Sequence, residues 1–219
     1  MKLINVLRKA NQEELKGMAK ILEMTHQDRY TPEEIEEKLM LKDSMASILF
    51  TKEKDRYHHM VYKTAKKLKV DSPKKYSTKE LEVKISQKVF KKMWNNMTPE
   101  QQEEFETKMK EVAKEHGNEK ALFANAGVFG ALTAAQLSGF GVYMLATTSL
   151  GAITGAMGIA LPFAAYTTMT SAIAVIIGPV GWIGAGLLAL FTLGGREYKK
   201  LIPAIIYVSM LRNKEYSKK

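Results

Sequence analysis

The residues best suited to acid–base or metal chemistry are the four histidines, His26, His58, His59 and His116. His58 and His59 are adjacent, so on a helix their side chains point about 100° apart and cannot easily bind one metal ion. No two histidines have the spacing of a zinc-binding helix, and the absence of cysteine excludes disulfides and cysteine-based zinc sites. The chain also lacks a phosphate-binding loop and a Gly-x-Ser-x-Gly nucleophile motif. We therefore expect no catalytic residues, no metal site and no cofactor, and a protein that is not an enzyme.

Glycines at regular spacing occur inside an uncharged run from Ala121 to Gly195, which contains no Asp, Glu, Lys, Arg or His. At a rise of about 1.5 Å per residue, this run is long enough for two or three crossings of a hydrocarbon core about 30 Å thick. Small residues three or four positions apart let membrane helices pack closely. The residues predicted to pack a membrane hairpin are Gly151, Gly155, Gly158, Gly178, Gly181 and Gly184. This spacing fits either self-assembly into a pore or packing of one hairpin against itself.

Basic residues flank the uncharged run on both sides, and the formal net charge of the chain is +10. Such a balance favours anionic partners, either lipid head groups or nucleic acid. No RNA-binding or helix-turn-helix signature is present, so lipid is preferred over nucleic acid as the partner. The alternative is that the basic residues form a helix face that contacts only solvent. The residues predicted to contact lipid head groups are Lys63, Lys66, Lys67, Arg196, Lys199 and Lys200. Because both flanks are basic, both ends are expected on the cytoplasmic side, which favours two spans and leaves three open.

The elements that must position these residues are helices. Asn11 with Glu14 and Ser77 with Glu80 have the spacing of a capping box, and Thr31-Pro32 and Thr98-Pro99 are typical helix starts. Apolar residues follow each start at helical spacing. Leu122–Leu145 and Ser171–Leu193 are the two candidate spans, with a third pass through Leu150–Met169 left open.

The predicted fold class is all-α: an N-terminal amphipathic helical bundle, then a glycine-rich hydrophobic helical hairpin, then a basic C-terminal helix. The predicted domains are a charged helical cytosolic domain over 1–117, a hydrophobic glycine-rich membrane-type region over 118–195 and a basic amphipathic tail helix over 196–219.

Several residues in the middle of the first domain resemble the YaaW-like bacterial proteins, a family without an assigned function. The resemblance rests on Tyr76–Glu80, Phe90, Trp94, Met97 and Glu104-Phe105, and it resumes at Tyr198 and Ile202–Ala204. It implies a bacterial, helical, cytosol-facing protein, identifies no catalytic residues in the family and leaves the activity open.

The function predicted from these patterns is that of a non-enzymatic, membrane-acting protein. Its hairpin would insert in or perturb the bilayer as an oligomeric pore of the toxin or defence type. The alternative is a membrane-anchored scaffold whose residues 1–117 recruit a protein partner. The predicted location is the bacterial cytoplasmic membrane, or the cytoplasm until a trigger exposes a sheltered hairpin. The predicted partners are anionic lipids, further copies of the chain and a protein partner.

Overall fold

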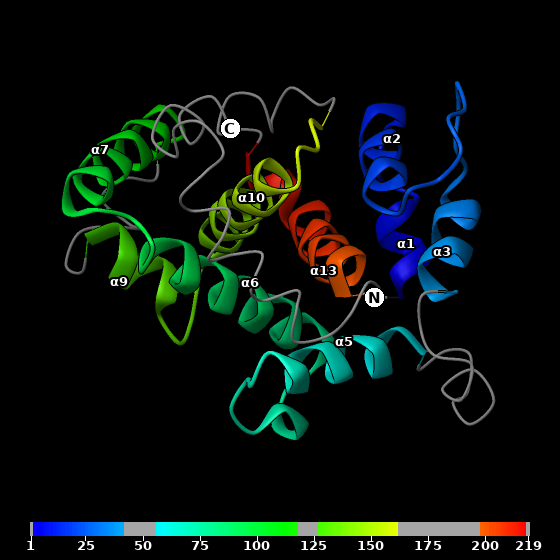
Figure 1. The fold of residues 1–219 in the computed structure, drawn as a ribbon, viewed down its shortest axis with the longest axis horizontal. Helices are drawn as coiled ribbons and strands as arrows, with labels where there is room; N and C mark the ends of the chain where they lie inside the picture. Colours follow the sequence, from blue (N-terminus) through cyan, green and yellow to red (C-terminus); the bar gives the residue numbers. More distant parts are fainter. Residues whose placement is uncertain (1, 42–55, 118–126, 162–197, 218–219) are drawn as a thin grey trace.

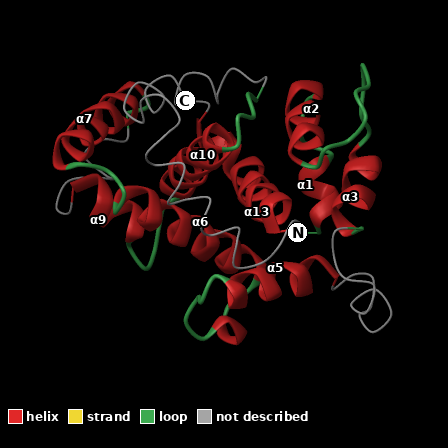
Figure 2. Ribbon diagram, in the orientation of Figure 1, coloured by secondary structure: helices red, strands yellow, loops and turns green. Residues whose placement is uncertain are grey.

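The computed structural model describes residues 2–41, 56–117, 127–161 and 198–217. In these ranges every regular element is a helix, which confirms the all-α class (Figure 2). The helices are α1 (Leu3–Leu7), α2 (Gln12–Ile21), α3 (Pro32–Met40), α5 (Arg56–Lys67), η2 (Pro73–Lys75), α6 (Thr78–Trp94), α7 (Pro99–Glu115), α9 (Gly127–Thr133), α10 (Gly139–Ala156), α13 (Tyr198–Asn213) and η3 (Lys214–Ser217).

The predicted helix starts are confirmed at α2, α3, α6 and α7. In α6 the Ser77 hydroxyl accepts from the backbone N–H of Glu80, and the Glu80 carboxylate accepts from the backbone N–H of Ser77. The same reciprocal pair begins α2 at Asn11, α3 at Thr31 and α7 at Thr98. Each box satisfies N–H groups that have no partner within the first turn of a helix. These short local patterns therefore determine where the outer helices begin.

Two helices without a polar face form the centre of the described fold. Figure 1 shows α10 and α13 side by side, with α1–α3 next to α13 and with α7 and α9 on the opposite side. The residues of α10 from Phe140 to Thr154 are buried, and so are those of α13 from Lys200 to Leu211. An apolar helix needs cover on every side, and amphipathic helices such as α2 and α6 provide it with their apolar stripes. One hydrophobic core runs through the described parts of all three predicted domains.

The prediction of a membrane-inserting hairpin is wrong. In the described part of the chain, no helix combines the length and apolar character needed to cross a bilayer. The candidate span Leu122–Leu145 is interrupted between α9 and α10, where Ser138 caps the start of α10. The apolar residues of α10 pack against α6 and α13 inside the protein. The pore, the membrane anchor and the cytoplasmic-membrane location, all inferred from that hairpin, therefore lose their support. The other candidate span, Ser171–Leu193, lies outside the described residues.

The contact between α2 and α13 gives a test of this packing. A Cβ atom added at Gly17 would lie 2.5 Å from the hydroxyl oxygen of Tyr207, a fully buried side chain. Gly17→Ala should therefore lower the free energy of unfolding by about 1–3 kcal/mol, because the buried ring has to move. A Cβ atom at Gly155 would meet nothing within 4 Å. Gly155→Ala should leave stability unchanged or raise it by about 0.5–1 kcal/mol. Urea unfolding of both variants checks this, and equal effects would contradict the packing of α2 on α13.

Candidate functional site

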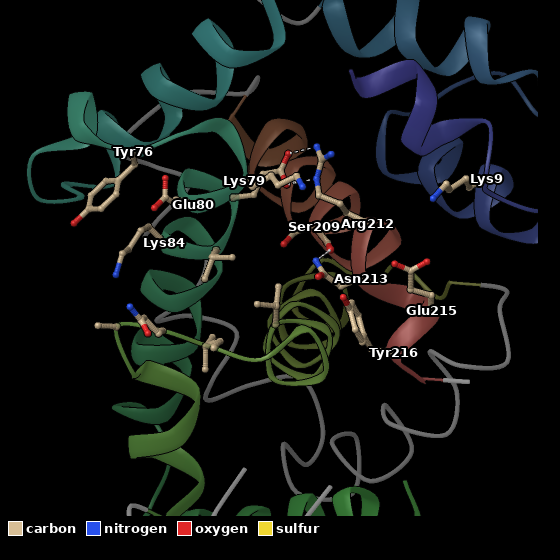
Figure 3. A pocket seen from close by; sticks show the side chains of 16 residues that line it. Lys9, Tyr76, Lys79, Glu80, Lys84, Ser209, Arg212, Asn213, Glu215 and Tyr216 are labelled. Carbon is tan, nitrogen blue, oxygen red and sulfur yellow. Dashed lines mark hydrogen bonds and ion pairs between the residues drawn. The ribbon is translucent and has the colours of Figure 1, made fainter. Parts of the chain in front are cut away.

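A pocket of about 740 Å³ opens between α6 and the C-terminal end of α13 (Figure 3). The N-terminal half of α6, the connection from Ala135 to Leu137, the end of α13 and η3 form its walls. This volume is within the range of small-molecule sites. The charged residues that line it are Lys9, Lys79, Lys84, Arg212, Glu80, Glu82 and Glu215.

A buried ion pair crosses the pocket wall from α13 to α6. Arg212 Nε donates to Glu82 Oε2 at 3.0 Å, and Arg212 Nη2 donates to Glu82 Oε1 at 2.9 Å. The two side chains are only 6% and 1% exposed. The Tyr57 hydroxyl of α5 donates to Glu82 Oε1 at 3.0 Å. This two-point geometry is the strongest form of an arginine–carboxylate contact, and it joins three helices.

Burial and neighbouring charges shift the pKa values of Tyr57 and Arg212, which both contact Glu82. Burial raises the pKa of Tyr57 well above its ordinary value, and the negative charge of Glu82 raises it further. Burial alone would lower the pKa of Arg212, but its hydrogen bonds to Glu82 and the charge of that carboxylate outweigh burial and raise it. Arg212 therefore stays charged beside the Glu82 carboxylate, and the Tyr57 phenol stays neutral.

Local contacts also position the other α6 residues that line the pocket. The Glu80 carboxylate accepts from the Ser77 backbone N–H and hydroxyl, each at 2.7 Å, and these bonds lower its pKa. Lys84 Nζ lies 3.3 Å from Gln87 Oε1 and 5.6 Å from the centre of the Tyr76 ring. These contacts hold Glu80 at the helix cap and place Lys84 beside a neutral amide and an aromatic ring, and the charge of Lys84 also lowers the pKa of Glu80.

Ser209 brings an unsatisfied polar group to the opposite wall. The residue is 1% exposed, and its hydroxyl has no hydrogen-bond partner among the described residues. Asn213 Nδ2, one turn later, donates to the Ser209 carbonyl at 2.8 Å. Buried hydroxyls are nearly always paired, so this one is an exception among the described residues beside the pocket. Sequence analysis missed Ser209, whose only signal is that it is a polar residue in an apolar helix.

The lysines predicted to contact lipid lie in different environments. Lys66 and Lys67 are exposed at the end of α5, and Lys63 is half-buried. Lys199 is exposed, whereas Lys200 is buried with its Nζ 2.6 Å from Glu23 Oε2. Arg196 lies outside the described residues. None of the five described lysines lines the pocket, and the lipid contact of all six residues stays a prediction.

The glycines predicted to pack a hairpin are also spread over different settings. Gly151 is buried within α10, and Gly155 and Gly158 are exposed. An added Cβ at Gly155 or Gly158 would meet nothing within 4 Å, and Gly158 has a φ of +69°. Gly178, Gly181 and Gly184 lie outside the described residues. Close helix packing by this set stays a prediction.

The described residues contain no group of three or more His, Asp or Glu side chains arranged to hold a metal ion. His58 Nδ1 lies 2.9 Å from Thr78 Oγ1, and His116 Nδ1 lies 2.8 Å from the Val112 carbonyl. Both side chains thus have local structural contacts, and neither lines the pocket.

Comparison with known proteins places the chain in a family. A UPF0174 protein from Helicobacter pylori strain J99 is 30% identical over 193 residues, which cover 86% of this chain and 74% of that protein. The chain belongs to the UPF0174 family. No family model and no solved structure matches this UPF0174 chain.

The raised pKa of Tyr57 predicts a pH dependence of the stability of this UPF0174 protein. In the unfolded chain Tyr57 ionises near its ordinary pKa of about 10, whereas the folded state holds it neutral. Its contribution to stability is therefore complete below about pH 10 and is lost as the pH rises, by up to about 1.4 kcal/mol per pH unit.

Urea unfolding between pH 9 and 11 should show a steeper fall in stability for the wild type than for Tyr57→Phe. Tyr216→Phe, which removes an exposed phenol, serves as the matched control and should follow the wild type. Identical pH slopes for the wild type and Tyr57→Phe would contradict the burial of Tyr57 against Glu82.

Proposed function

We propose that this protein is a non-enzymatic binding protein that holds a small ligand in the pocket between α6 and α13. The observation that carries the proposal is the convergence of polar groups from α6, α13 and η3 on a pocket of about 740 Å³ whose wall contains the buried Arg212–Glu82 pair. Ligand sites typically combine such a volume with a few fixed polar groups, often between packed helices.

A binding role fits the lining residues better than a catalytic one. General acid–base catalysis needs a group that is able to gain or lose a proton near neutral pH. Glu82 is ion-paired with Arg212, and the lowered pKa of Glu80 keeps that carboxylate ionised at the helix cap. No histidine or aspartate is among the described residues that line the pocket.

A ligand in this pocket would touch elements that are distant in the sequence. It would bridge α6 to the C-terminal end of α13 and to η3, and it would bind only when these elements are assembled. A ligand that binds only the folded state raises the free energy of unfolding, by about 2.7 kcal/mol at one hundred times its Kd. Binding would therefore stabilise the docking of the C-terminal helix.

We also propose that the YaaW-like bacterial proteins are relatives of this chain within the same family. Tyr76 and Glu80, which carry part of that resemblance, both line the pocket. The related proteins would then use the same position for their ligand.

Ligand-observed NMR with a panel of anionic, neutral and cationic aromatic fragments tests the proposed function. Val83 lies in the α6 wall of the pocket, so Val83→Trp should fill the space and abolish the binding of the fragments that the wild type binds. Lys91→Trp places the same indole on an exposed position of α6 outside the pocket and should leave binding intact. The proposal fails if no fragment binds the wild type, or if both variants bind the fragments equally well.

A further inference from the structure

The charges around the pocket are unequally compensated. Among its lining residues, Lys9, Lys79, Lys84 and Arg212 are cationic, and Glu80, Glu82 and Glu215 are anionic. Glu82 neutralises Arg212, and the carboxylate of Glu80 is turned to the Ser77 cap at the positive end of α6. Lys84 contacts an amide and an aromatic ring, and its charge also acts on the Glu80 carboxylate. Among the described lining residues, the uncompensated groups are thus two lysines, Lys9 and Lys79, and one glutamate, Glu215.

One end of the pocket combines cationic charge with hydrogen-bond donors. Figure 3 shows Lys79 extending from α6 toward Arg212, with Ser209 and Asn213 on the neighbouring turns of α13. No acidic side chain in the described ranges forms an ion pair with Lys79. Glu215 lies on the η3 side of the view, away from Lys79. An ammonium group on α6 and a hydroxyl and an amide on α13 line the same pocket, and one N–H of that amide already donates to the Ser209 carbonyl. Groups of these three kinds are able to surround a single anionic group.

We infer that the ligand is a small organic anion, and that its carboxylate or phosphate group binds at Lys79, Ser209 and Asn213. This inference rests on the proposed use of the pocket as a ligand site. Lys79 supplies the charge that selects an anion over its neutral analogue. The Ser209 hydroxyl is closed to solvent in this structure, so an anion contacts it only when the side chains that cover it move aside. It has no partner among the described residues, so bonding to an anion costs it no internal hydrogen bond. Arg212 acts as a positioning residue, because Glu82 already holds its guanidinium and thereby fixes the turn that carries Ser209 and Asn213.

A purely structural role of the Ser209 hydroxyl would have a different effect on stability when the hydroxyl is removed. A hydroxyl that stabilised the fold would have a donor or acceptor partner within it, and its removal would lower the stability. Ser209→Ala should instead leave the midpoint of thermal unfolding unchanged or raise it, because the hydroxyl is buried without a partner. A fall in that midpoint together with unchanged anion affinity would show a structural role and would overturn the assignment of Ser209.

The test of the ligand class is an NMR titration with benzoate and benzamide, which have nearly the same shape and differ in charge. The wild type should bind benzoate at least about tenfold more tightly than benzamide, as expected when one charge-assisted contact is made. Lys79→Gln should remove most of that difference, and Ser209→Ala should weaken benzoate several-fold. Lys91→Gln removes an exposed lysine of the same helix outside the pocket and should match the wild type.

The outcomes separate this inference from the proposed function. Equal binding of benzoate and benzamide, both blocked by Val83→Trp, would keep the ligand site and overturn the anionic class. Binding of neutral or cationic fragments without binding of any anionic one would do the same. If no fragment binds the wild type, the proposed function fails, and this inference fails with it. A preference for benzoate that Lys79→Gln leaves unchanged would overturn the role of Lys79 and the placement of the anion.

Discussion

The contact on which the described structure most depends is the buried pair between Arg212 and Glu82. The helix α13 is apolar on every side, and apolar packing alone sets its register only loosely. A two-point ion pair at one end has a single satisfied geometry, because an unpaired charge in this position would be strongly destabilising. Tyr207 adds a second fixed point in the middle of the helix, where its hydroxyl donates to the Glu14 carbonyl at 2.8 Å. At the start of the helix, Lys200 forms an ion pair with Glu23, which follows α2. These three polar contacts hold α13 at several points along its length.

The pocket is a consequence of the same arrangement. The turn that presents Arg212 to Glu82 also carries Ser209 and Asn213, so the ion pair and the proposed ligand site share one wall. The other wall depends on the Ser77–Glu80 cap, which fixes the start of α6 and with it the position of Lys79. Binding a ligand here would connect the two walls, and the stability of α13 docking and the affinity for the ligand would then be thermodynamically linked.

The sequence predicted the outer helices well and the central ones poorly, for a physical reason. Capping boxes such as Ser77–Glu80 and apolar stripes are local, so they are readable from neighbouring residues. The helix α10 carries no charge and has no polar face, and such a pattern is the same for a helix buried in lipid and for one buried in protein. Its neighbours decide between the two, and α6 and α13 are those neighbours. The pocket was missed because Glu82 and Arg212 are 130 residues apart in the sequence, and no motif marks Ser209.

The most direct test of this account is a double-mutant cycle on the ion pair, with Glu82→Gln, Arg212→Met and the double variant compared by urea unfolding. Each single variant should lose about 3–5 kcal/mol of unfolding free energy, because each leaves a buried polar or charged partner unpaired. The double variant should lose clearly less than the sum, with a coupling of about 2 kcal/mol or more. Small and additive losses, each below about 1 kcal/mol, would show that the pair is solvated and does not hold α13 in place.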